Sequence, residues 1–179
     1  SYDTPEKTIA LYDQVLERVA AIPGVEQAAL SSVLPLDGGD SDMSFAIEGR
    51  PAVSVASEVP VAWYRLVSAG YFEAIGMRIV RGRSFADREP APSVVVNETF
   101  VRRYFPGEDP LGRRLRFGAP DRPAFTIVGV VADVSGRGAR EDTRVETFVP
   151  YRQMPERGMN IVLRGPIPGS WPTPLRQAV

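Results

Sequence analysis

The chain has neither cysteine nor histidine among its 179 residues. Without cysteine it has no disulfide bond, no thiolate nucleophile and no zinc–thiolate site. Without histidine it lacks the Ser-His-Asp triad, histidine-activated nucleophiles and every metal site that uses an imidazole. Any catalysis would therefore depend on carboxylates, tyrosines, backbone groups or Lys7, which is the only lysine.

The sequence also lacks a strong net charge and a long hydrophobic run. Its formal net charge is −1, and no stretch approaches the roughly 20 apolar residues that span a bilayer. Basic residues are spread along the chain, with short pairs such as Arg102-Arg103 and Arg113-Arg114. We interpret these pairs as parts of a solvated face, and we expect no nucleic-acid partner.

The two ends of the sequence have no feature of a natural terminus. The chain begins at Ser1 without an initiator methionine or a signal peptide. It stops inside a helix that we expect to start at Thr173. We therefore expect both ends to lie within a longer protein.

Capping residues and apolar spacing predict three complete helices. Thr4 and Pro5 favour the start of the first, whose apolar residues recur on one face until Pro23-Gly24. The other two cover residues 69–75, where Ser68 is the candidate cap and Gly76 the end, and residues 98–104, capped by Asn97.

Alternating or β-branched apolar residues predict the strands. Met43, Phe45 and Ile47, for example, alternate with smaller or polar residues. The expected extended segments cover residues 26–33, 43–47, 53–61, 63–67, 77–80, 93–96, 113–117, 124–131, 144–150 and 160–164. Because the strands outnumber the helices and do not alternate with them steadily, an α+β fold is favoured over a doubly wound parallel sheet.

Two loops resemble ligand-binding motifs only in part. Asp37, Asp40 and Asp42 could hold calcium, but their spacing does not match an EF-hand loop, and we interpret them as a polar turn. The loop at Gly136-Arg137-Gly138 lacks the third glycine and the following helix of a phosphate-binding loop. We interpret it as an exposed loop.

The remaining candidate sites are a carboxylate and two aromatic pairs. Asp133 follows a buried strand, and Glu98 or Asp121 would be its acid/base partner, but nothing in the sequence brings them together. A capping role for Asp133 is favoured. The pairs Tyr71-Phe72 and Tyr104-Phe105 are read as core packing rather than ligand stacking. The residue patterns thus predict no catalytic, cofactor-binding or metal-binding residue.

A series of short phrases, in order, covers nearly the whole chain. They are Ile22-Pro23-Gly24-Val25, Leu34-Pro35-Leu36, Val67-Ser68-Ala69-Gly70-Tyr71-Phe72, Arg81-Gly82-Arg83-Ser84-Phe85, Val94-Val95-Val96-Asn97-Glu98, Tyr104-Phe105-Pro106-Gly107, Asp109-Pro110-Leu111-Gly112, Ile127-Val128-Gly129-Val130-Val131 and Phe148-Val149-Pro150-Tyr151. Each phrase alone is weak, but their joint order and spacing are specific. Together they resemble the MacB-like periplasmic core domain of MacB/FtsX-type permeases, especially the duplicated orphan permeases.

The resemblance implies a domain that lies between the first two transmembrane helices of a permease. It implies a porter-like subdomain formed by residues 1–62 and a truncated second part, residues 150–179. A mainly-β, sabre-like subdomain, residues 63–149, would be inserted between them.

The same resemblance implies a non-catalytic, periplasmic part of an inner-membrane ABC transporter. Such a domain would transmit conformational change and dock partners or substrates in export, efflux or mechanotransmission. Its partners would be the transmembrane helices, a cytoplasmic ATP-binding subunit or domain, and a periplasmic adaptor or other protein. No cofactor is implied.

Two other functions stay open. A solute-binding or sensor module would need a sizeable apolar pocket between the subdomains. A carboxylate hydrolase would need two carboxyl groups within about 10 Å of each other in a cleft.

Overall fold

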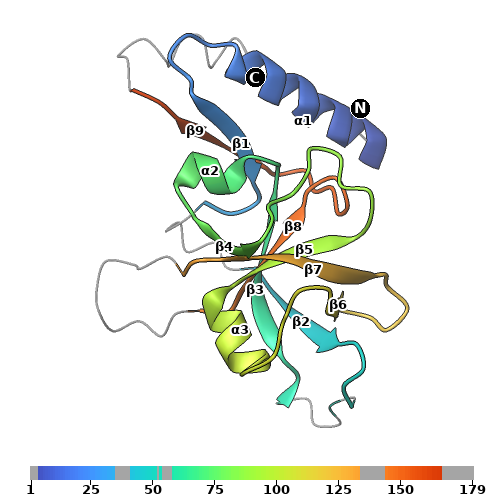
Figure 1. The fold of residues 1–179 in the computed structure, drawn as a ribbon. Coiled ribbons are helices and arrows are strands. Elements are labelled where there is room, and N and C mark those ends of the chain that lie inside the picture. The colour runs from blue at the N-terminus through green and yellow to red at the C-terminus, as the bar shows by residue number, and fades with distance from the viewer. Residues whose placement is uncertain (1–3, 35–40, 52, 54–57, 134–143, 167–179) are drawn as a thin grey trace.

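The computed structural model describes residues 4–34, 41–51, 53, 58–133 and 144–166, as drawn in Figure 1. It is a mixed α and β fold built around a sheet. The helices in this part of the chain are α1 (Pro5–Ala20), α2 (Tyr71–Ile75) and α3 (Glu98–Tyr104). The strands are β1 (Gln27–Ser31), β2 (Asp42–Ile47), β3 (Val61–Val67), β4 (Ile79–Gly82), β5 (Ser93–Asn97), β6 (Arg114–Phe117), β7 (Ala124–Val131), β8 (Glu146–Pro150) and β9 (Asn160–Arg164).

Two of the three predicted helix caps are confirmed. The Thr4 side chain accepts a hydrogen bond from the Lys7 N–H at the start of α1, and Asn97 accepts one from Phe100 at the start of α3. The prediction for Ser68 is wrong, because α2 begins after Gly70 without a side-chain cap. The Ser68 hydroxyl instead accepts the N–H of Leu30 at 2.9 Å.

The predicted strands agree with the observed ones to within a few residues, and residues 124–131 and 160–164 agree at both ends. The strand β4 is displaced by two residues at both ends, and β8 starts two residues later than expected. The extended segment expected over residues 53–61 is wrong for residues 58–60, which are not in a strand, and only Val61 belongs to one, at the start of β3. Residues 54–57 lie outside the described residues, as does the helix expected from Thr173.

Six strands form a closed ring of hydrogen-bonded neighbours in the order β2-β6-β7-β5-β8-β3 and back to β2. The β5–β7 and β3–β8 pairs are parallel and the other four are antiparallel. The strand pair β1–β9 continues the sheet outward from β3, and β4 pairs with β7 outside the ring. Figure 1 shows β1, β9 and α1 at one end of the molecule and α3 with β2 toward the other.

The interior of the ring is filled by the alternate residues of its strands, as the period of a β-strand requires. Phe45, Tyr64, Leu115 and Ile127 belong to this core and are at most 3% exposed. Phe100 of α3 joins the same cluster, with its ring centroid 5.2 Å from that of Phe45. The helix α3 therefore contributes its apolar side to the core of the ring.

The other two helices pack against separate surfaces of the sheet. The helix α2 contributes Tyr71 and Phe72 to a second cluster, which includes Val95 and Phe148 of the ring. The helix α1 packs Val15, Val19 and nearby apolar residues against β1 and β9. Each helix thus buries one apolar face, which is what its sequence spacing requires.

Candidate functional site

Asp133 caps α3 from the end of β7. Its carboxylate accepts hydrogen bonds from the Thr99 N–H at 3.0 Å and the Thr99 hydroxyl at 2.9 Å, and it pairs with Arg102 at 2.9 Å. The Asp133 N–H donates to the Glu98 carboxylate at 3.2 Å. The capping role predicted for Asp133 is confirmed, and Glu98, not Asp121, is the carboxylate beside it.

The position of Asp121 follows from the direction of β7. Asp121 precedes this eight-residue strand and Asp133 follows it. The full length of the strand, at roughly 3.3 Å per residue, therefore separates the two carboxylates. Both oxygens of Asp133 already accept hydrogen bonds that hold α3 in place. This arrangement stabilises a helix end rather than positioning two carboxyl groups in a cleft.

The loop candidates lie mostly beyond what the structure describes. Asp42 starts β2 opposite Trp63, whereas Asp37, Asp40 and the loop at residues 136–138 are outside the described residues. Within residues 4–34, 41–51, 53, 58–133 and 144–166, no group of three acidic side chains is placed to hold a metal ion.

Tyr71, Phe72 and Phe105 are buried core residues and Tyr104 packs against the core, which confirms the packing interpretation. Tyr71 and Phe72 are at most 1% exposed, and the Phe72 ring lies 5.1 Å from that of Phe148 in an edge-to-face contact. The Phe105 side chain is 1% exposed and the Tyr104 ring packs edge-on against Phe45 at 5.1 Å. Such edge-to-face contacts stabilise a core.

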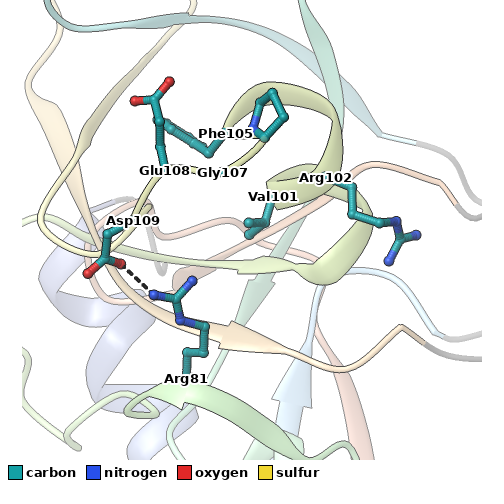
Figure 2. A pocket seen from close by; sticks show the side chains of 8 residues that line it. Arg81, Val101, Arg102, Phe105, Gly107, Glu108 and Asp109 are labelled. Carbon is teal, nitrogen blue, oxygen red and sulfur yellow. Dashed lines mark hydrogen bonds and ion pairs between the residues drawn. The ribbon is translucent and has the colours of Figure 1, made fainter.

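A shallow, open cavity of about 540 Å³ lies between the end of α3 and β4. Figure 2 shows Val101, Phe105 and Arg102 on the helix side and Arg81 with Asp109 opposite them. Arg81 pairs with Asp109 at 2.9 Å. Pro106, Gly107 and Glu108 complete the lining, so the cavity combines small apolar contacts with charges of both signs.

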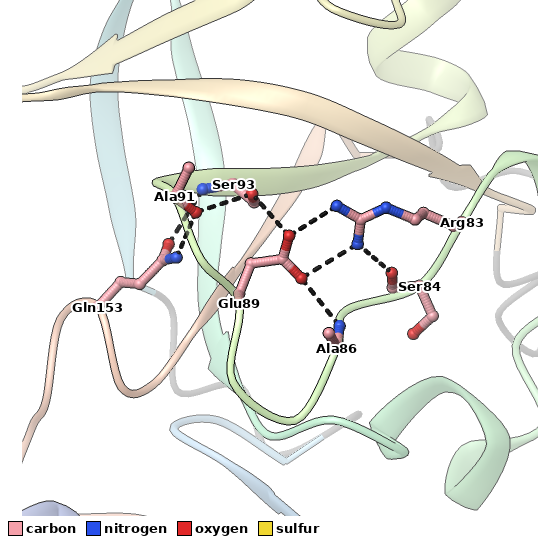
Figure 3. A network of polar contacts seen from close by, with 7 residues as sticks. All are labelled: Arg83, Ser84, Ala86, Glu89, Ala91, Ser93 and Gln153. Carbon is pink, nitrogen blue, oxygen red and sulfur yellow. Dashed lines mark hydrogen bonds and ion pairs between the residues drawn. The ribbon is translucent and has the colours of Figure 1, made fainter.

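A buried carboxylate organises the loop between β4 and β5 (Figure 3). The Glu89 side chain is 2% exposed and accepts hydrogen bonds from Arg83, from the Ala86 N–H and from the Ser93 hydroxyl. The hydrogen bonds from Arg83 hold the pKa of Glu89 below its ordinary 4.5, against the opposing effect of burial. Gln153 connects this loop to the turn after β8, since it accepts the Ser93 N–H and donates to the Ala91 carbonyl.

A buried ion pair joins β3 to β8. Arg65 and Glu146 are 3.0 Å apart, and both side chains are 13% exposed. Burial raises the pKa of Glu146 above its ordinary value, and the positive charge of Arg65 opposes that rise. The Arg144 guanidinium lies 3.9 Å from the centre of the Trp63 ring at the same end of the two strands.

The segment between β8 and β9, residues 151–159, connects α1 to the ring. We call it the connecting segment. The Tyr151 hydroxyl donates to Asp13 of α1 at 2.5 Å, and Arg152 pairs with the same carboxylate. The Tyr12 hydroxyl donates to the Arg157 carbonyl at 3.0 Å and accepts the Met159 N–H at 3.2 Å.

The connecting segment also contacts the strands of the ring. The Tyr64 hydroxyl of β3 donates to the Met154 sulfur at 2.9 Å, and burial raises the pKa of Tyr64. Together with Gln153, these contacts place the segment between α1 on one side and the ring on the other. Sequence reasoning missed this site, because no spacing relates Tyr12 and Asp13 to residues about 140 positions away.

The comparisons with known proteins agree with this architecture. A profile of the MacB-like periplasmic core domain matches residues 3–177. In solved structures, the fold is similar to the periplasmic region of MacB from Actinobacillus actinomycetemcomitans, with a TM-score of 0.63 and 15% identity over 93% of this chain and 70% of that chain. It is also similar to the extracellular domain of the noncanonic ABC-type transporter YknZ from Gram-positive bacteria, with a TM-score of 0.61 and 14% identity over 90% and 76% of the two chains.

A curated relative is the macrolide export ATP-binding/permease protein MacB of Nitrosomonas europaea, which is 33% identical over 79 residues. The match covers 42% of this chain and 12% of the relative's length. The fold and the sequence match together define an extracytoplasmic domain of the kind found in ABC transporter permeases. The chain belongs to the family of MacB-like periplasmic core domains. None of the helices in its described part is both long and apolar enough to cross a membrane.

Proposed function

We propose that this domain is a non-catalytic lever of an inner-membrane ABC transporter permease. It transmits conformational change from the membrane to the periplasm and docks partners or substrates there, in export, efflux or mechanotransmission. The connecting segment carries this proposal, because it joins α1 to the ring through Asp13, Tyr151 and Arg152 on one side and Gln153 on the other. A movement of α1 therefore acts on the ring through defined contacts.

Two further features support a role in transmission. The sheet is continuous from β9 through β1 and β3 into the ring, so the two ends share backbone hydrogen bonds. The buried Arg65–Glu146 pair crosses from β3 to β8 beside that path. The pair joins the two strands in one register, because sliding one strand past the other would separate its two charges in a largely buried site.

The proposed division follows the family resemblance. Residues 1–62 and 150–179 would form the porter-like part, and residues 63–149 the sabre-like part. The transmembrane helices and a cytoplasmic ATP-binding subunit or domain would supply the movement, and a periplasmic adaptor or another protein would receive it. Solute binding is not favoured, because the cavity of Figure 2 is open and edged by ion pairs instead of being an enclosed apolar pocket.

The proposal is tested in the full-length permease, reconstituted in lipid nanodiscs. One spin label is placed on α3 by Arg103→Cys, to which this chain adds no competing cysteine, and a second label is placed on the ATP-binding part of a permease whose other cysteines have been replaced. We expect the distance between the labels to change between the ATP-bound and ADP-bound states. In the Asp13→Ala/Arg152→Ala variant this change becomes smaller or disappears, while ATP hydrolysis continues.

The matched control is Glu17→Ala/Arg18→Ala, which removes one acid and one base from the exposed face of α1. This control retains the nucleotide-dependent change. A label distance that ignores the nucleotide, or a full response in Asp13→Ala/Arg152→Ala, would overturn the proposed transmission through the connecting segment.

A further inference from the structure

Two glutamates on the ring surface each bridge a pair of arginines. Glu108 accepts Arg50 on one oxygen at 3.3 Å and Arg113 on the other at 3.2 Å. Glu48 likewise contacts Arg114 at 3.0 Å and Arg116 at 3.2 Å through separate oxygens. We call these six residues the arginine strip.

The two bridged sets are neighbours on the surface. Glu48 follows β2, and its N–H donates to the carbonyl of Arg114 in the neighbouring strand β6 at 2.9 Å. Arg113, which belongs to the other set, directly precedes Arg114 in the chain. Four guanidinium groups share two carboxylates, which leaves an excess of two positive charges. The whole chain carries −1, so this excess is local.

The stability of the fold does not account for the strip. Its side chains are between 30% and 53% exposed, and exposed ion pairs contribute only about 0–1 kcal/mol each. A guanidinium group has five N–H donors, and Arg113 and Arg114 each direct one nitrogen at their glutamate. Donors held in this way match a further carboxylate, because the planar guanidinium binds carboxylates in pairs of parallel hydrogen bonds.

One arginine of the strip is held by a second contact. The Arg50 guanidinium lies 4.8 Å from the centre of the Phe105 ring, a cation–π contact with a buried aromatic residue. A fixed guanidinium loses less conformational entropy when it binds a ligand. The contact with Phe105 thus partly preorganises the strip for binding an anion.

The cavity of Figure 2 adjoins the strip, because Glu108 lines the cavity and also bridges Arg50 and Arg113. Its other charged side chains are paired with each other or with neighbours, as Arg81 is with Asp109 and Arg102 with Asp133. Val101 and Pro106 provide apolar contacts in its lining.

We propose that the arginine strip and this cavity bind an acidic segment of a partner protein, in which an apolar side chain is flanked by carboxylates. The local excess of two charges suits one or two carboxylates, whereas an anionic bilayer or a nucleic acid presents a long array of charges. The strands β2 and β6 beside the strip are each paired with two neighbours, so the strip presents side chains rather than a free strand edge. The inference rests on the proposed docking function and adds the chemical class of the partner.

The test uses the 179-residue chain and two labelled peptides. One is acetyl-Ala-Glu-Leu-Glu-Ala-amide, in which two carboxylates flank an apolar side chain, and the other replaces each glutamate with glutamine. We expect fluorescence anisotropy to show binding of the acidic peptide that weakens when salt is raised from about 0.02 M to about 0.5 M, because salt screens exposed charges. In the Arg113→Gln/Arg114→Gln variant the affinity falls about fivefold or more.

The matched control is Arg18→Gln/Arg88→Gln, which removes the same charge from exposed residues outside the strip and retains the affinity. Equal binding of both peptides, no binding, or equal losses in the two double variants overturns the inference. Binding only to phosphatidylglycerol vesicles also overturns it and identifies a lipid surface instead. None of these results decides the proposed transmission, which the nucleotide-dependent change in label distance tests separately.

Discussion

Two glycines allow a close backbone approach between β4 and β7. Gly129 of β7 lies against β4, and a β-carbon built there would be 2.1 Å from the Arg83 carbonyl oxygen. Gly82 has a φ of +68°, and its β-carbon would be 2.3 Å from the Val128 carbonyl oxygen. Glycine at these positions is what allows β4 to pair with β7 outside the ring.

The first prediction follows from this contact. Gly129→Ala forces backbone to move, so we expect the free energy of unfolding to fall by about 2 kcal/mol or more, as measured by urea denaturation. Gly158→Ala is the control, because its added β-carbon would meet nothing within 4 Å. Similar stabilities of the two variants would contradict the close approach of β4 and β7.

A single buried amide connects α3 to β8 at the scale of the elements. Asn97 is fully buried, and its side-chain oxygen accepts the N–H groups of Phe100 and Glu146. Its side-chain nitrogen donates to the Arg144 carbonyl at 2.7 Å. The residue is therefore more than a helix cap, because it also fixes the start of a ring strand.

We expect Asn97→Ala to lower the free energy of unfolding by about 3 kcal/mol, since it leaves one buried and two part-buried backbone groups without this partner. Thr4→Ala removes an exposed cap of α1 and should cost only about 1 kcal/mol. Chemical denaturation of both variants measures the difference. Equal losses would show that the contacts of Asn97 with β8 contribute nothing.

Local chemistry accounts for the elements that the sequence predicted correctly. Thr4, Asn97 and Gly76 act on neighbouring backbone groups, so their roles are visible in a few adjacent residues. Ser68 was misassigned because a partner 38 positions away, the Leu30 N–H, competes for its hydroxyl. Local propensity cannot show which partner prevails.

At the scale of the whole molecule, the ring could not be predicted from residue patterns. Its closure depends on the pairing of β2 with both β3 and β6, and neither hydrophobic alternation nor β-propensity specifies strand neighbours. The same limit applies to the candidate site. Asp133 was recognised as a cap, but its contact with Glu98 and the contacts of Gln153 join residues distant in sequence.

The stability of the whole chain should depend on pH through Glu89. Its folded pKa is lowered, so the ionised carboxylate stabilises the fold above its ordinary pKa of 4.5, and this contribution is lost as the pH falls through the folded value. Glu89→Gln should therefore lower the free energy of unfolding at pH 7 by about 2 kcal/mol.

The difference between the wild-type chain and Glu89→Gln should shrink when urea denaturation is repeated below the ordinary pKa. Glu17→Gln, on the exposed face of α1, serves as a control and should match the wild type at both pH values. A difference that stays constant with pH would show that the ionisation of Glu89 does not contribute.

The closed ring also has a consequence for how such domains diversify. The chain enters the ring at β2 and leaves it at β8, and these two strands flank β3 on opposite sides. The strands by which the chain enters and leaves the ring therefore both lie beside β3, while α1, β1 and β9 lie outside the ring. A replacement of the ring in a relative would have to reproduce the border around β3, the packing of α2 against β1 and β9, and the contacts of the connecting segment.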